Sequence, residues 1–259
     1  MTKRALHLKT PTSSLLVDAE RHPLRPPDTM ATFGSTVIVA PHPDDESLGC
    51  GGVLALLADC GNPVHVIVMT DGSRSHPHSR SYPAARLAAV REWETLDALA
   101  ALGLPAHITR FLRYPDCALP CIGTVAFNDA AAQLHNTLLA LTPDTILVPW
   151  RRDPHCDHEA TWRLLRAAAV CLPAPPRWLE YPIWAWPQAE SALAPHTDDG
   201  HAWRLDIGPV LARKAQAIAR HRSQTGGLIH DDPSGFVLKP AMLAYFTRPW
   251  ELFIEPADD

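Results

Sequence analysis

The sequence predicts an α/β protein with a Rossmann-like, open and mostly parallel sheet that carries helices on both faces. Short apolar runs rich in β-branched residues recur along the chain. Between them lie segments with apolar residues at helical spacing, and the connections are short. Because the strand-like runs are apolar throughout, we expect strands that are buried on both faces, as in parallel sheets.

The first predicted unit is a strand over 35–42, a helix over 53–60 and a strand over 64–72. So short a βαβ unit implies a right-handed crossover. The polar, proline-punctuated segment 73–83 predicts a surface loop with solvated histidines. The remaining elements are predicted in this order: a helix over 86–103, a strand over 107–116, a helix over 124–141, a strand over 144–150, a helix over 158–172, a strand over 177–186, a final helix within 205–227 and a terminal strand over 249–255.

No repeat or linker divides the chain, so we expect an N-terminal extension over 1–34 and a single domain over 35–259. The N-terminus lacks the apolar core of a signal peptide and no stretch is long enough to span a membrane, which indicates a cytoplasmic protein. The six cysteines contain no CxxC pair and are expected to be free thiols. A net charge of -5 argues against nucleic acid as a partner. The oligomeric state stays open, a homo-oligomer included.

Two polar clusters each follow a predicted buried strand: PHPDDE (41–46) and DPHCDH (153–158). Either cluster alone would indicate an ordinary solvated turn or helix cap. In an open α/β sheet, however, ligands bind outside the carboxyl ends of the strands. We therefore expect the two clusters to converge on one site.

The residue types in these clusters suit a catalytic metal. His42 and Asp45 can face one ion across a proline-containing turn, and His158 supplies a third ligand. Two imidazoles and one carboxylate leave an open position for water, whose pKa Zn²⁺ lowers to about 7. Fe²⁺ and Co²⁺ suit the same ligands. The thiolate of Cys156 is a further ligand of the right chemistry, although its neighbours are better placed.

The two adjacent aspartates, Asp44 and Asp45, are predicted to have different roles. Neighbouring side chains diverge, so Asp44 is free to act as a general base beside the bound water. His155 could face the developing oxyanion, and Asp157 could orient it. Glu46 is expected to cap or brace the turn. The chain has no GxGxxG pattern, which argues against a dinucleotide site.

These residues resemble the PIG-L/LmbE-like family of zinc-dependent N-acetylglucosamine deacetylases. The similarity extends over about 35–225, and its most specific parts are HPDDE with the following glycines (42–52) and HCDH (155–158). Weaker support comes from Arg91, Glu94 and Ala98 with the following Leu-Gly, from YPD (114–116), and from KAQAIARHRSQ (214–224).

The resemblance implies a zinc site, a base and an acid. By it, the zinc ligands would be His42, Asp45 and His158, and Asp44 would deprotonate the water. His155, paired with Asp157, would stabilise the oxyanion or protonate the amine. Arg91 and Asp116 match positions that line the sugar site, with a helix-surface ion pair and a turn cap as their alternatives. His221 either approaches the pocket or lies on a helix surface.

Two departures from the family pattern bear on the substrate. Asp153 stands where some relatives carry a tyrosine that polarises the amide carbonyl, and Cys117 replaces the glycine usual after YPD. The resemblance implies a metal-dependent hydrolase that deacetylates an N-acetyl amino sugar or a related small molecule. An amidase for a non-sugar or thiol-conjugate amide is an alternative. A non-catalytic metal- or sugar-binding module is another, against which the intact Asp44 position argues.

Overall fold

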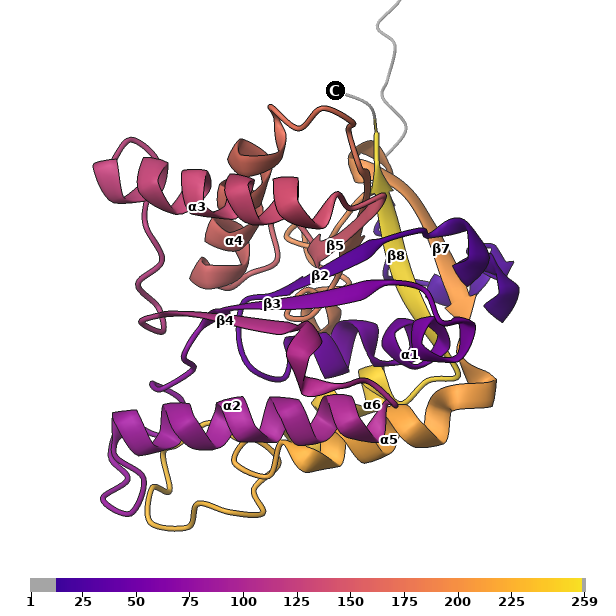
Figure 1. The fold of residues 1–259 in the computed structure, drawn as a ribbon. Coiled ribbons are helices and arrows are strands. Elements are labelled where there is room, and N and C mark those ends of the chain that lie inside the picture. The colour runs from indigo at the N-terminus through magenta and orange to yellow at the C-terminus, as the bar shows by residue number, and fades with distance from the viewer. Residues whose placement is uncertain (1–12, 258–259) are drawn as a thin grey trace, which may run out of the picture.

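The computed structural model describes residues 13–257, and an eight-stranded sheet runs through their centre (Figure 1). Every strand is parallel to its neighbours except β8, which is antiparallel to both β6 and β7. This confirms the open, mostly parallel α/β sheet. Across the sheet the order is β1 (Leu24–Arg25), β7 (Gly200–Asp206), β8 (Trp250–Pro256), β6 (Arg177–Tyr181), β5 (Thr145–Pro149), β2 (Thr36–Ala40), β3 (Val64–Thr70) and β4 (Thr109–Tyr114).

Helices cover both faces of the sheet, as predicted (Figure 1). Along β2 the side chains alternate: Val37 and Val39 join the core on one face, while Ile38 and Ala40 join the core on the other. One face carries α1 (Asp45–Cys60), α2 (Ala84–Ala101), α5 (Leu211–Arg220) and α6 (Pro240–Phe246), and the other carries α3 (Val125–Leu141) and α4 (Cys156–Ala169). Six 3-10 turns complete the described chain: Ala19–Arg21, Pro27–Thr32, Ala106–Ile108, Trp186–Gln188, Thr197–Asp199 and Gly208–Val210.

Helix α1 begins eight residues before the predicted helix, directly after the first polar cluster. Its glycines lower helix propensity, which is why the pattern predicted only the apolar second half. They are required by close packing: a Cβ at Gly49 would lie 2.4 Å from Tyr181, and one at Gly52 would lie 2.4 Å from Ile207. The glycine run is therefore the face by which α1 packs against later parts of the chain.

The ends of the chain differ most from the prediction. Segment 205–227 contains α5, as predicted, but it begins with the end of β7, and α6 follows it, so the prediction that this helix is the final one was wrong. Within the expected extension, β1 pairs with β7, and Met30 and Phe33 are fully buried in the core. Residues 13–34 thus pack into the fold, while residues 1–12 lie outside the described part.

The strand order places a crevice between β2 and β5. From β2 the chain continues outward to β3 and β4, whereas β5 continues in the opposite direction to β6. Such a reversal opens a crevice at the carboxyl ends of the two strands, where open α/β sheets bind ligands. The turns after β2 and β5 are the two polar clusters. Within residues 13–257, no helix has the length and apolar character needed to cross a membrane.

Candidate active site

The turn that leads from β2 into α1 is strained. Asp44 has φ 141° and ψ -25°, a region that residues other than glycine rarely adopt. Such strain costs on the order of 1–3 kcal/mol and persists only where neighbours hold it. The Asp44 N–H donates to Glu46 Oε2 at 3.0 Å, and Arg91 donates to the Pro43 carbonyl at 2.6 Å. Glu46 therefore braces the turn, as expected.

The buried side chains of the three predicted metal ligands, His42, Asp45 and His158, meet at one oxygen of Asp45. Asp45 Oδ2 lies 3.2 Å from His42 Nδ1 and 3.3 Å from His158 Nε2. Burial by itself would raise the pKa of Asp45, but His158 and His42 lower it well below its usual range. Burial also opposes protonation of His158, yet Asp45 and Asp153 raise its pKa to about 9. The positive charge of the protonated histidines holds these three side chains together. A bound cation would supply that charge in place of the histidine protons.

Among the described residues, the environment of His158 fits a metal ligand. Its two ring nitrogens lie near carboxylates, but neither makes a hydrogen bond of good geometry. A fully buried imidazole without such partners has a lone pair available for a cation. Other donor sets also share His42: its ligand atoms come within 4.8 Å of those of His155 and His158, and of those of Asp116 and Asp157. The cluster can therefore hold a metal ion, and His42 is its common member.

Asp153 holds the second turn in place, which the sequence reasoning missed. Its Oδ1 lies 3.0 Å from His158 Nδ1. The same carboxylate accepts the backbone N–H groups of Ile183, Trp184 and Ala185 at 2.8 to 3.1 Å. A carboxylate behind a metal-binding histidine fixes its ring and tautomer. An aspartate five residues before His158 could have indicated this role from the sequence. From the sequence alone, Asp153 was interpreted only as a replacement of the family's tyrosine.

Asp44 faces the cavity with the pKa of a base that works near neutral pH. Burial raises the pKa of Asp44 to about 6, against the lowering effect of Arg91, whose Nη2 lies 3.2 Å from Asp44 Oδ1. At pH 7 such a carboxylate is mostly ionised and still accepts a proton readily. Arg91 is itself buried, so its helix-surface alternative is wrong.

His155 is positioned as a neutral donor. It caps the N-terminus of α4, where its Nδ1 accepts the Asp157 N–H at 3.2 Å. Burial, with the cationic neighbours His42 and His158, lowers the pKa of His155 to about 4. The ring is therefore neutral at pH 7, and we assign its proton to Nε2 because Nδ1 accepts. An imidazole N–H of this kind can donate to an oxyanion.

The carboxylate of Asp157 does not pair with His155, so that expectation was wrong. Asp157 Oδ2 lies 3.1 Å from His42 Nε2 and accepts the Cys117 N–H at 2.7 Å. Asp116 approaches the same nitrogen of His42 at 3.5 Å and accepts the Arg74 N–H at 2.9 Å. Asp157 lies in the first turn of α4, where its backbone N–H serves the cap and its carboxylate bonds the turn of Cys117 and His42 instead.

His221 lies neither on a helix surface nor against the cavity. It is buried behind the strained turn, and its Nε2 is 3.2 Å from Glu46 Oε1. Burial would lower the pKa of His221, but Glu46 raises it above its ordinary value. Glu46 therefore links His221 to the backbone of Asp44. The loop over 73–83 was also predicted to be solvated, but its His76 is buried.

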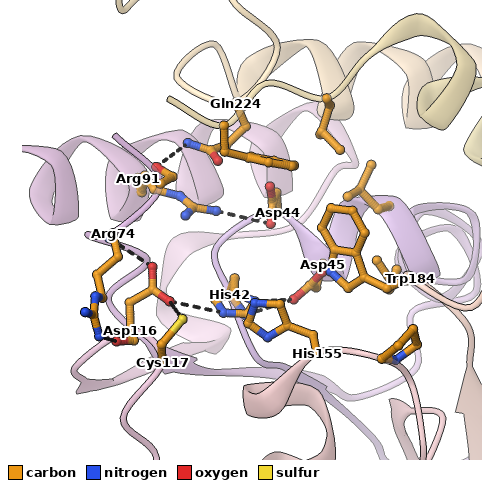
Figure 2. A pocket seen from close by; sticks show the side chains of 16 residues that line it. His42, Asp44, Asp45, Arg74, Arg91, Asp116, Cys117, His155, Trp184 and Gln224 are labelled. Atoms are coloured by element: carbon orange, nitrogen blue, oxygen red, sulfur yellow. Dashed lines mark hydrogen bonds and ion pairs between the residues drawn. The ribbon is translucent and has the colours of Figure 1, made fainter. Parts of the chain in front are cut away.

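Asp44, Asp45, His42 and His155 line a cavity of about 420 Å³. Figure 2 shows this cavity from close by. Asp44 with Arg91 lies on one side, His42 lies between Asp45 and Asp116, and Trp184 stands beside His155. The Trp184 and His155 rings stack with centroids 6.5 Å apart. His158 and Asp157 are not among the lining residues. Leu48, Pro154 and Gln224 lie within motifs that the sequence singled out, and the lining residues that it did not indicate are Arg74, Ser75, Ile183, Trp184, Phe236 and Leu238.

The fold and the site define a Rossmann-like α/β protein with a histidine–aspartate cluster, able to hold a metal ion, beside a buried candidate base. The sequence model of PIG-L, described as GlcNAc-PI de-N-acetylase, matches residues 37–169, which include both clusters. The chain therefore belongs to the PIG-L family of de-N-acetylases.

Individual proteins resemble this chain at low identity. The probable N-acetyl-alpha-D-glucosaminyl L-malate deacetylase 2 of Bacillus cereus is 26% identical over 229 residues, covering 83% of this chain and 98% of the relative. The N,N'-diacetylchitobiose deacetylase structure from Pyrococcus horikoshii has a TM-score of 0.61 at 22% identity and covers 81% of this chain and 76% of that one. GalB, the 4-carboxy-2-hydroxymuconate hydratase of Pseudomonas putida, has a TM-score of 0.62 at 20% identity, with coverages of 83% and 84%. At these identities the solved structures show the fold alone.

Proposed function

We propose that this protein is a metal-dependent N-deacetylase that hydrolyses the acetamide of an N-acetyl amino sugar to acetate and a free amine. The observation that carries the proposal is the shared cavity. Asp44, with its raised pKa, lines it together with His42, Asp45 and His155. A module that only bound metal or sugar would have no need of a second, buried aspartate in this position.

We assign the metal to His42, Asp45 and His158, and Zn²⁺ is the ion that suits two imidazoles and one carboxylate best. Fe²⁺ and Co²⁺ are accommodated by the same ligands. When bound, such an ion polarises the acyl carbonyl and makes water more acidic. Asp153 keeps His158 oriented for this task.

The protein's own groups carry the protons. Asp44 accepts a proton from the attacking water, and Arg91 holds the Asp44 carboxylate toward the cavity. His155 stabilises the oxyanion of the tetrahedral intermediate through Nε2–H. The protonated Asp44 then delivers its proton to the departing amine and the C–N bond breaks, because the neutral His155 ring has no acidic proton to give.

The shape of the cavity supports a sugar. Charged and polar side chains line the cavity together with Trp184 and Phe236, whose ring centroids lie 5.5 Å apart. Sugar rings present apolar faces that pack on aromatic side chains, and amino-sugar deacetylases occur among the relatives. The six cysteines are free thiols, which supports a reducing cytoplasm as the location.

The decisive experiment combines Asp44→Asn with metal analysis. If Asp44 is the base, turnover on N-acetyl amino sugars should fall roughly 10²- to 10⁴-fold. The metal content should stay at the wild-type level, because Asp44 is not a ligand in this assignment. Acetate release and elemental analysis measure the two quantities. Asp198→Asn changes an exposed carboxylate and serves as the matched control. Full activity of Asp44→Asn would remove Asp44 from the mechanism.

A further inference from the structure

A second group of potential metal ligands lies beside the first. The ligand atoms of Cys117, His155 and Cys156 all come within 4.8 Å of one another. Both cysteines are exposed and His155 is half-buried, whereas His42 and His158 are buried. Figure 2 shows Cys117 and His155 on the same side of the cavity. The proposed catalytic site does not use either thiol.

Three features hold this cluster together before any ligand binds. Cys156 begins α4 directly after His155, which caps that helix. Cys117 comes from the distant turn after β4, and its N–H donates to Asp157 in the first turn of α4 at 2.7 Å. Cys117 has φ 57°, a left-handed conformation that the bond to Asp157 helps to fix. The two cysteines thus approach each other through ordered backbone.

The ligand set selects a soft cation. Two thiolates and one imidazole form a common Zn²⁺ donor set, and Cd²⁺ or Cu⁺ binds it as well. Mg²⁺ and Ca²⁺ prefer oxygen ligands and are poor competitors here. Binding displaces the protons of both thiols, so two protons are released for each divalent ion bound.

We propose that Cys117, His155 and Cys156 form a second, inhibitory site for a soft metal ion at the mouth of the cavity. An ion bound at Nε2 replaces the proton that His155 would donate to an oxyanion; that proton moves to Nδ1, which then gives up the Asp157 N–H. When this second, outer site is occupied, His155 no longer takes part in the reaction. The first ion stays bound to His42, Asp45 and His158. The consequence for activity rests on the proposed deacetylase function, whereas binding at the outer site does not.

The binding test is a titration of the fully reduced, metal-loaded protein with Cd²⁺ under a non-thiol reductant. We expect one additional equivalent to bind with an ultraviolet thiolate-to-metal charge-transfer band and release of two protons. Cys156→Ser should lose the band and the tight extra equivalent. Cys171→Ser alters an exposed cysteine outside the cluster and should behave as wild type. Binding and a band that persist unchanged in Cys156→Ser would overturn the site.

The functional test measures acetate release during a Zn²⁺ titration. Wild type and Cys171→Ser should lose activity with the second equivalent, by roughly 10²-fold, since removal of one oxyanion donor costs about that much. Cys156→Ser should retain its activity at the same excess, and Mg²⁺ should inhibit none of them. Inhibition of Cys156→Ser at the wild-type concentration would overturn the inhibitory role. Because the charge-transfer band is read without substrate, an inactive protein would still report on the site.

Discussion

The two turns that build the site are held by different means. The turn after β2 places Asp44 in a strained conformation and is braced from outside by side chains, Arg91 and Glu46. The turn after β5 is braced from within, because Asp153 accepts three backbone N–H groups of the segment that follows β6. The first turn carries the candidate base, and the second orients His158, the predicted metal ligand. The strained turn thus depends on a charge partner, whereas the other depends on backbone hydrogen bonds.

The largest effect should come from Asp153→Ala, which removes the internal brace. Three N–H groups, of which those of Ile183 and Ala185 are buried, would lose their acceptor, and each buried group costs roughly 1–3 kcal/mol. We expect the free energy of unfolding to fall by at least about 3 kcal/mol and metal affinity to drop about 10- to 100-fold, as for other lost partners of metal-binding histidines. Chemical denaturation and metal competition measure these quantities. Asp198→Ala is the control, and equal stability of the two variants would show that Asp153 is no brace.

Arg91→Met should have a smaller effect on stability, about 2 kcal/mol, because Asp44 can take up a proton when its cation is lost. Activity should nevertheless fall, since a protonated Asp44 is no base. Arg91→Lys keeps the charge but loses the paired bonds to Gly72 and Pro43, so it should recover only part of the activity. Denaturation and acetate release test both variants. Wild-type activity in Arg91→Met would show that the strained turn keeps its conformation without Arg91.

The smallest effect, about 1 kcal/mol, is expected for His221→Gln and should depend on pH. The folded pKa of His221 is raised by Glu46 after burial has lowered it. A raised folded pKa stabilises the protein fully below the unfolded value of about 6.5, and this contribution is lost as pH rises through the folded pKa. The stability difference between wild type and His221→Gln should therefore be larger at pH 6 than at pH 9. His107→Gln, at an exposed position, is the control. A stability difference that does not change with pH would show that the ion pair between His221 and Glu46 does not stabilise the protein.

The sequence could predict those features that neighbouring residues and strand order determine, and not those that depend on contacts between distant elements. The convergence of HPDDE and HCDH followed from strand order, because parallel strands end at one edge. The side-chain partner of Asp157 could not be predicted, since it depends on where the turn of Cys117 crosses α4. Trp184 and Asp153 were missed for the same reason: their partners lie in other elements. The start of α1 was missed because its glycines are required by packing against residues far away in the sequence.

Those contacts have a consequence for the order of folding. The glycine face of α1 packs against Tyr181, Ile207 and Lys214, all of which are synthesised more than a hundred residues after it. Helix α1 carries Asp45 in its first turn, so this half of the site has no complete support until the later segments have docked. Contacts so distant in sequence form slowly and late. A nascent chain that ends before residue 207 would therefore present the HPDDE motif without the packing that shapes it, and catalytic competence should be among the last properties the protein acquires.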